Sequence, residues 1–402
     1  MTIPIIITIC VLLLLAYVFD LSSPKTKIPT VILLLVLGWA VRQSSALLEL
    51  SIPDLTPILP ILGTIGLILI VLEGSLELEL NKSKLPLVGK SSLLAFLPMV
   101  LTIIGLALAF QYYGNTSFKN ALANAIPFAV ISSAIAIPSV LNQESKIKEF
   151  VTYESSLSDI FGVIFFNFIT LNDFIGTMSL GYFLFELLFI LIITFIATVA
   201  LAYLLSKIKH HVKFAPIILL IILIYGVSKI YHLPALIFIL LFGLFLGNLD
   251  ELKKFKFIRI LQPEILDNEV HKFKELTSEI AFLIRSLFFL LFGYLIATAE
   301  LLNTESLKWA LAITLGIFIL RYISLKILKF AISPLLFIAP RGLITILLFL
   351  TIPISQTIEF INKSLIIQVI ILTGFVMMFG LMMNKKNNQS TKPVNEPKFE
   401  NI

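Results

Sequence analysis

Residues 149–170 read EFVTYESSLSDIFGVIFFNFIT, an apolar segment interrupted near its centre by a run of polar residues. At a helical rise of about 1.5 Å per residue, Asp159 lies ~15 Å into this segment, near the middle of a ~30 Å hydrocarbon layer. A carboxylate at that depth is costly in lipid, so we expect it to face a helix bundle or a watery cavity. Glu154 and Ser158 are four residues apart, as are Ser155 and Asp159, so these groups share one helix face. The stretch therefore predicts an ion or proton site inside a membrane.

The composition supports a membrane protein. The 402 residues are 58% hydrophobic and 13% charged, with a mean hydropathy of +1.03, which is far too apolar for a soluble protein. The net charge of +6 follows from the loops described below, so no nucleic acid partner is predicted. A single cysteine, Cys10, allows no intramolecular disulfide. The first apolar run lacks a basic region and a cleavage site, so it is not predicted to be a removable signal.

The apolar runs predict thirteen membrane spans, of which the second, eighth and ninth are short. They lie at about 2–19, 28–41, 58–73, 86–112, 119–142, 149–170, 181–205, 214–229, 233–248, 278–300, 306–330, 334–354 and 362–383.

The basic residues support this number of spans. Of the thirty Lys and Arg residues, 23 fall in the tail or after odd-numbered spans, and five fall after even-numbered spans. Arg321, Lys326 and Lys329 are counted among the 23, at one end of the span 306–330. Because cytoplasmic loops are enriched in Lys and Arg, we expect the N-terminus outside and the C-terminus in the cytoplasm.

An odd central span implies two halves of opposite orientation. Residues 1–170 are expected to form one six-helix repeat and residues 214–383 a second, inverted repeat, joined by a connecting helix at 181–205. Together they make one transmembrane domain over residues 1–383, followed by a short cytoplasmic tail at 384–402. The fold class predicted is an all-α polytopic membrane protein.

Both halves carry an interrupted fifth span. The first has Pro127 and Pro138 flanking two serines, and the second contains Pro340-Arg341-Gly342. Proline removes a backbone donor and glycine weakens a helix, so we predict a discontinuous helix in each half. Broken helices at matching places indicate a binding site near the membrane midplane. Two ordinary proline kinks are the alternative.

Charges inside the spans are expected to have partners. We predict that Glu154 pairs with Arg341, because both lie at similar depth, which leaves Asp159 free to bind a proton or a cation. The alternative for Asp159 is a second structural pair with Arg285. Arg285 itself is assigned either to pairing or snorkelling, or to gating.

Other candidate features are simpler. Glu73, Glu77 and Glu79, at the cytoplasmic end of the third span, are interpreted as a solvated span end, with a cation-attracting funnel as the alternative. Gly243 and Gly247 indicate close helix packing. No histidine lies in a cluster with metal-ligand spacing, and no nucleotide-binding glycine motif occurs. Neither a cofactor nor a metal beyond a transported cation is therefore predicted.

Four stretches together resemble the monovalent cation:proton antiporter superfamily, within it the sodium/hydrogen exchanger family, over nearly the whole chain. Val71–Leu78 is similar to the Gly-Leu-Glu-Leu segment of the third helix, and Ser132-Ser133-Ala134 stands where members have Thr-Asp-Pro or Ser-Ser-Thr. Glu154–Asp159 resembles the Glu-Ser-x-x-Asn-Asp motif, and Pro340–Gly342 resembles the arginine-glycine of the second unwound helix. Two departures, Ser158 in place of Asn and the missing aspartate at 132–133, leave the identity of the cation open.

The resemblance implies crossing unwound helices, a dimerisation domain and a mobile core domain that moves like an elevator. It also implies that Asp159 binds the cation or proton. The residues expected to bind the ion together with Asp159 are Ser155, Ser158, Ser132 and Ser133.

We therefore expect an antiporter, not an enzyme, that exchanges Na⁺, Li⁺ or K⁺ for H⁺ in the cytoplasmic membrane, as a homodimer. Because Asp159 is the one carboxylate left to titrate, we expect electroneutral exchange. A channel would need a selectivity filter and an intramembrane enzyme would need a nucleophile or metal motif, and the sequence shows neither.

Overall fold

The computed structural model describes residues 2–26, 28–48, 54–78, 83–141, 143–172, 181, 188, 192–204, 213–230, 235–249 and 263–384. Over those residues every regular element is a helix. The order is α1 (Thr2–Thr26), α2 (Thr30–Leu47), α3 (Ile58–Glu77), α4 (Leu85–Gly114), α5 (Phe118–Ala129), α6 (Ser133–Ser139), α7 (Ser145–Leu171), α9 (Phe214–Ile230), α10 (Ala235–Gly247), α12 (Pro263–Tyr294), α13 (Thr298–Leu301), α14 (Thr304–Ile327), α15 (Leu343–Leu350), the short 3₁₀ helix η2 (Ile354–Gln356) and α16 (Lys363–Asn384).

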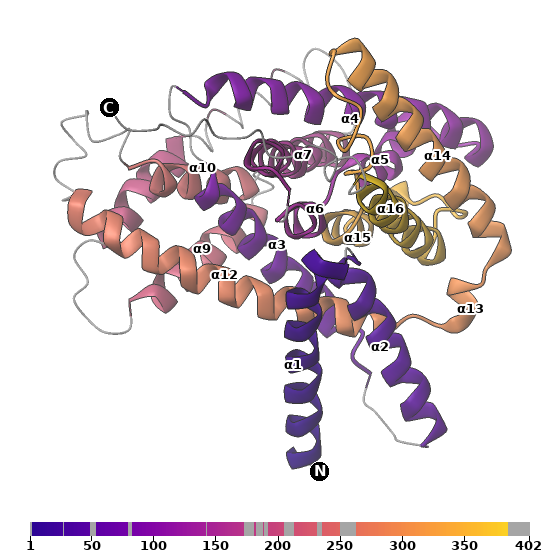
Figure 1. Ribbon diagram of the computed structural model, residues 1–402, viewed down its shortest axis with the longest axis horizontal. Coiled ribbons are helices and arrows are strands. Elements are labelled where there is room, and N and C mark those ends of the chain that lie inside the picture. Colours follow the sequence, from indigo (N-terminus) through magenta and orange to yellow (C-terminus); the bar gives the residue numbers. More distant parts are fainter. Residues whose placement is uncertain are drawn as a thin grey trace, which may run out of the picture.

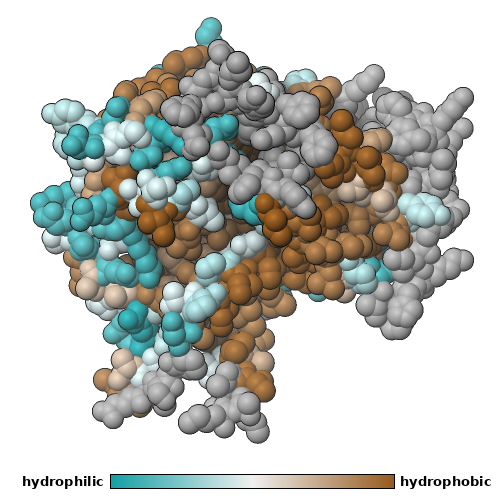
Figure 2. All heavy atoms as spheres, turned by 180° about the vertical axis from the view of Figure 1, so that it is seen from behind, coloured by the Kyte–Doolittle hydropathy of each residue, from teal (hydrophilic) through white to brown (hydrophobic). Residues whose placement is uncertain are grey.

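Eight segments of the described chain are long and apolar enough to cross a membrane. Three shorter apolar helices accompany them, namely Ile192–Leu204, α9 and α10. Hydrophobic side chains cover broad parts of the surface, and hydrophilic ones gather toward one side (Figure 2). An apolar exterior of this extent suits contact with lipid rather than with water. The prediction of an all-α polytopic membrane protein is confirmed.

Some boundaries differ from the expected spans. The short second span is longer than predicted, because α2 continues to Leu47. The tenth begins well before residue 278, because α12 starts at Pro263 and includes polar residues that precede the expected span. Lys272 and Glu269 form an ion pair at 3.6 Å across one helical turn. Such a pair adds to the stability of the polar first part of α12 as a helix. Much of the connecting helix 181–205 and nearly all of the tail 384–402 lie outside the described residues.

The helices pack as two groups (Figure 1). The first group consists of α1, α2, α3, α9, α10 and α12, in which α12 packs on α2 and α3, and α10 packs on α3. The second group consists of α4, α5, α6, α7, α14, α15 and α16, in which α4 packs on α5 and α7, and α14 packs on α16 and α4. Each group therefore takes helices from both halves of the chain. The repeat boundaries themselves stay a prediction.

Two glycines permit close contact between α10 and α3 in the first group. A Cβ atom built on Gly243 would overlap Ser75, and one built on Gly247 would lie 2.7 Å from the carbonyl oxygen of Leu76. The predicted close packing at this glycine pair is confirmed, and it fixes α10 against the end of α3.

Candidate functional site

Two breaks in the helices form the centre of the second group. In the first, α5 ends at Ala129 and α6 begins at Ser133, so Val130, Ile131 and Ser132 are not helical. In the second, non-helical backbone precedes the start of α15 at Leu343. The backbone N–H of Ser132 donates to the carbonyl oxygen of Pro340 at 2.9 Å, so the two breaks cross in direct contact. The prediction that two unwound segments cross is confirmed. The first is a helix in two parts, α5 and α6, whereas residues 328–342 before α15 contain turns and irregular backbone instead of a first helical part.

A glycine allows the crossing to be this close. The backbone φ angle of Gly342 is −168°, an extended conformation open to any residue. A Cβ atom built on Gly342, however, would lie 2.5 Å from the hydroxyl oxygen of Ser132 and 2.8 Å from a methyl carbon of Ile135. Space rather than backbone strain therefore requires glycine here.

Arg341 binds backbone carbonyls, and the prediction that it pairs with Glu154 is wrong. Its Nε donates to the carbonyl oxygen of Phe128 at 2.5 Å, and a terminal nitrogen donates to that of Ala339 at 2.8 Å. The last carbonyls of a helix lack partners, and the negative end of the helix dipole attracts a cation. Breaking α5 creates such carbonyls beside the crossing, and the Arg341 guanidinium satisfies them.

Glu154 pairs with Arg321 of α14 instead. Its two carboxylate oxygens accept hydrogen bonds at 2.6 and 3.1 Å from the two terminal nitrogens of Arg321, whose Nε donates to the carbonyl oxygen of Leu335 at 2.8 Å. Both residues are 1% exposed. A buried, two-pronged arrangement of this kind satisfies both charges.

The sequence contained a signal for Arg321 that charge counting missed. Arg321 was grouped with Lys326 and Lys329 at one end of a span, although it lies inside the expected span 306–330. An arginine six residues before the end of an apolar helix lies about 9 Å from that end, too deep for a solvated position without snorkelling.

Asp159 lies beside the crossing with one free oxygen. It is 4% exposed, and its Oδ2 accepts a short hydrogen bond from the Ser133 hydroxyl at the start of α6. Its Oδ1 is buried, and no group in the described part of the chain bonds to it. Buried polar atoms are nearly always paired, so an unpaired carboxylate oxygen marks a place for a proton or a cation.

Three of the four predicted serine ligands lie at the crossing or bond to it, and the fourth bonds within its own helix. The Ser158 hydroxyl accepts a hydrogen bond from the backbone N–H of Ile131 at 2.9 Å and so attaches α7 to the first break. Ser132 and Ser133 both lie at the crossing, where Ser133 reaches Asp159. Ser155, in contrast, donates to the carbonyl oxygen of Val151 in its own helix at 2.8 Å. The structure therefore brings Ser133 to Asp159 and engages Ser155 elsewhere.

The buried charges of the site balance. Glu154 and Arg321 neutralise each other, and Arg341 and Asp159 carry one positive and one negative charge without a direct ion pair. With Asp159 ionised and empty, these four groups sum to zero. Binding one proton or one monovalent cation adds the same single charge, so the two loaded forms are electrostatically alike.

Arg285 belongs to the first group and has a different partner. It lies 4.0 Å from Glu73 of α3, and Ser278 donates to the same carboxylate at 2.5 Å. The alternative pairing of Arg285 with Asp159 is therefore wrong. So is the interpretation of Glu73 as a solvated residue, because its side chain is only 18% exposed. Its α12 partners are distant in sequence, which is why charge spacing did not reveal them.

A resident metal site is a separate question. Over the described residues no three His, Cys, Asp or Glu side chains gather closely enough to hold a metal ion. His210, His211 and His232 lie outside those residues.

Comparison with known proteins agrees with this geometry. The family described as sodium/hydrogen exchanger, transmembrane, matches residues 10–384. Two solved structures of the sodium proton antiporter MjNhaP1 from Methanocaldococcus jannaschii have the same fold. One, at pH 8, is 18% identical with a TM-score of 0.68, over 95% of this chain and 96% of that one. The other, an electron-microscopy map, is 19% identical with a TM-score of 0.67, over 98% and 100%. No curated protein matches the sequence. The chain belongs to the sodium/hydrogen exchanger family, a family of cation:proton antiporters.

Proposed function

We propose that the protein exchanges Na⁺ for H⁺ across the membrane, one for one, with Asp159 as the group that carries either ion. Li⁺ and K⁺ are the other candidate cations. The observation that carries the proposal is the buried Oδ1 of Asp159, which has no partner in the described part of the chain. A carboxylate in this position is stabilised by whichever cation reaches it, so Na⁺ and H⁺ compete for one place.

The surroundings of Asp159 favour a small monovalent cation. Ser133 provides a hydroxyl oxygen beside the carboxylate, and two unwound segments cross next to it, as in other transporters with broken helices. We assign Ser132 and Ser158 to holding these segments in place. Ser155 becomes a ligand only if its hydroxyl turns away from Val151.

The ion pair of Glu154 supports electroneutral exchange. A second titrating carboxylate would let two protons move per cation and so move net charge. Glu154 is instead held by Arg321 through two hydrogen bonds. Asp159 then exchanges one proton for one monovalent cation.

The two helix groups support an elevator-like motion of the second group against the first. The groups touch at several places, including α3 with α15 and α3 with α7. At the α3–α7 contact, a Cβ atom built on Gly74 would lie 3.3 Å from the Ser156 hydroxyl oxygen and 4.0 Å from its Cβ. Ser156 lies one helical turn before Asp159, on the side of Asp159 where α7 begins. Movement of the second group would open that side and close the other.

The setting of the protein is proposed on the same basis. From the distribution of basic residues we place the N-terminus outside and the C-terminus inside. The cytoplasmic membrane and a homodimer are proposed from membership of the family alone. The face where α7 ends is then the outer face.

Everted membrane vesicles provide the direct test. A pH gradient is formed, and Na⁺, Li⁺ and K⁺ are added in turn while a pH-sensitive dye reports the gradient. We expect at least one cation to collapse the gradient with saturating kinetics, and Asp159→Asn to abolish the response while the purified variant keeps its melting temperature. If none of the three cations acts over a broad pH range, the proposed function is lost; ohmic, non-saturating conductance would indicate a channel instead.

A further inference from the structure

A pocket lies between the two helix groups, one turn from Asp159. Val163 and Asn167 line it from α7, Thr64 from α3, Tyr225 and Lys229 from α9, and Thr351 follows α15. Val163 is four residues beyond Asp159, so the pocket begins on the same face of α7, about 6 Å farther along.

The lining residues show on which face the pocket opens. They come from the second half of α7, the last turns of α9 and the end of α15, together with the first half of α3 and the first turn of α10. α7, α9 and α15 end at the pocket, whereas α3 and α10, which run in the opposite direction, begin there. All of these parts therefore lie toward one face of the molecule. On the proposed orientation this is the outer face, opposite the contact between Gly74 and Ser156.

Polar side chains lead through the pocket, and one of them is charged. Thr64, Asn167, Tyr225 and Thr351 provide oxygen atoms among apolar neighbours. Lys229 is the one charged residue among the described lining residues, and its side chain is exposed. No acidic side chain of the described residues forms an ion pair with it. A cation that reached Asp159 through this pocket would pass a positive charge with no acidic partner among the described residues.

We propose that Lys229 acts as an electrostatic filter at the outer entrance, weakening the binding of cations from outside and promoting their release to that side. The inference rests on the proposed function. Lys229 would make the cation affinity differ between the outer and inner faces. It does not touch Asp159 but changes the electrostatic potential along the path to it.

The size of the effect follows from the distance. Asn167, which shares the pocket with Lys229, is eight residues or ~12 Å along α7 from Asp159. We take this axial distance as the separation between the Lys229 charge and Asp159. Effective dielectric constants between 80 and 20 then give a change in cation affinity of about twofold to about tenfold. The effect acts from the outer face only, because the pocket opens to that face.

Both competing ions feel the same charge, which gives the filter a distinctive pH dependence. Removing the charge strengthens Na⁺ binding and H⁺ binding by the same factor. At alkaline pH, where Asp159 is mostly unprotonated, the outer KM for Na⁺ falls by the full factor. At acidic pH the stronger proton binding cancels the stronger Na⁺ binding, and KM stays the same.

Lys229→Gln tests the filter in membrane vesicles of both orientations. We expect the outer KM for Na⁺ to fall by about twofold to tenfold at alkaline pH and to be unchanged at acidic pH, with the inner KM unchanged throughout. Added impermeant salt should shrink the difference, because the Debye length at 0.1 M, about 10 Å, is comparable with the distance involved.

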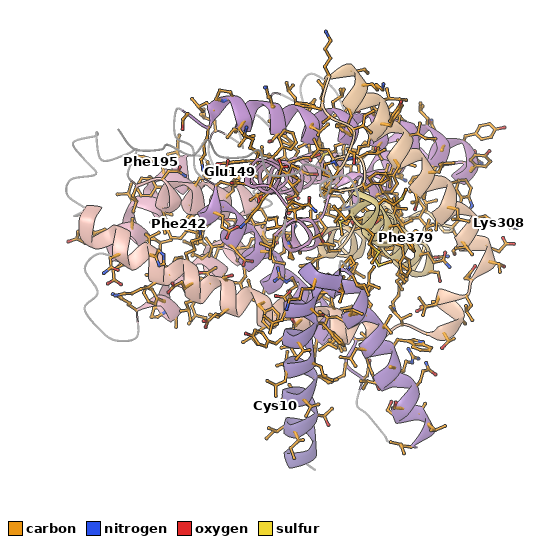
Figure 3. All side chains as sticks on the ribbon, in the orientation of Figure 1. Cys10, Glu149, Phe195, Phe242, Lys308 and Phe379 are labelled. Atoms are coloured by element: carbon orange, nitrogen blue, oxygen red, sulfur yellow. The ribbon has the colours of Figure 1, made fainter. Side chains whose placement is uncertain are left out.

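Two matched variants complete the experiment. Lys229→Arg keeps the charge and should behave like the parent. Lys308→Gln removes an exposed lysine at the start of α14. Lys308 lies at the opposite end of the molecule from Phe242 of α10, a helix whose first turn lines the pocket (Figure 3). This variant should therefore leave both KM values unchanged. An outer KM for Lys229→Gln that equals the parent's, or that shifts equally at both faces or at every pH, would overturn the filter. A parent protein that exchanges no cation would overturn the proposed function instead.

Discussion

At the scale of single residues, the partner of each buried charge decides what the site can do. Because Arg321 holds Glu154 through two hydrogen bonds, that carboxylate is committed to structure. Arg341 is occupied by the carbonyls of Phe128 and Ala339. Asp159 is thereby left with a free oxygen, which an extra cationic partner would have occupied.

Removing the charge of Arg321 should destabilise the protein strongly. Arg321→Met keeps most of the side-chain volume but leaves Glu154 buried without a counter-charge, so we expect the free energy of unfolding to fall by roughly 3–5 kcal/mol. Thermal or denaturant unfolding in mild detergent measures this. Combining it with Glu154→Gln should recover part of the loss, since no isolated charge remains.

The matched control is Lys326→Met, which removes an exposed charge from the same helix and should change stability by no more than about 0.5 kcal/mol. If Arg321→Met unfolds like this control, the ion pair described here is not what stabilises Glu154.

The sequence predicted which residues belong to the site better than it predicted their pairing. Asp159, Glu154, Ser133 and Arg341 stood out because polar groups in apolar spans are costly. The partner of Glu154 could not be derived from depth alone, since two arginines lie within reach of the same level. The choice depends on which helices pack together and on the carbonyls that the broken α5 leaves to Arg341.

At the scale of elements, the two breaks form a single unit. The Ser132 N–H bonds to Pro340, and Ser158 of α7 bonds to the backbone of Ile131, so α7 and both unwound segments are connected by hydrogen bonds. The prolines flanking the first break were visible in the sequence. The helix, however, tolerates Pro127 inside α5 and Pro138 inside α6, and it is interrupted between them.

Gly342→Ala should loosen the crossing. Its Cβ would lie 2.5 Å from the Ser132 hydroxyl oxygen, which forces the segments apart, and we expect a loss of roughly 1–3 kcal/mol in unfolding free energy together with reduced exchange. Unfolding in detergent and dye-based transport assays measure the two effects.

Gly316→Ala in α14 is the control, because a Cβ atom there meets nothing within 4 Å. Alanine should be neutral or slightly stabilising at this helical position. Equal stability of the two alanine variants would mean that the crossing is not closely packed at Gly342.

At the scale of the whole molecule, the division into two helix groups is the feature on which the proposed elevator-like motion rests. Hydropathy and basic residues predicted the spans and the inverted order, because each span needs about 20 apolar residues and loops carry the charge bias. The contacts between groups were not predictable, since they depend on small residues, such as Gly74 against Ser156, that meet only in the folded chain.

Cross-linking the groups should stop transport. With Cys10→Ser as background, Gly74→Cys and Ser156→Cys would place two Cβ atoms about 4.0 Å apart, within the range for a disulfide. We expect an oxidant to abolish exchange and a reductant to restore it, while each single cysteine variant is unaffected. Full exchange by the cross-linked protein would contradict movement of one group against the other.

We propose that Asp159 alone carries one cation or one proton per step. Na⁺-driven H⁺ movement by purified protein tests this most directly, in liposomes whose membrane potential is clamped with K⁺ and valinomycin. We expect the same rate at every imposed potential and no exchange by Asp159→Asn. A rate that changes with voltage would show that a second charge moves with the site, and one-for-one exchange at Asp159 alone would then be wrong.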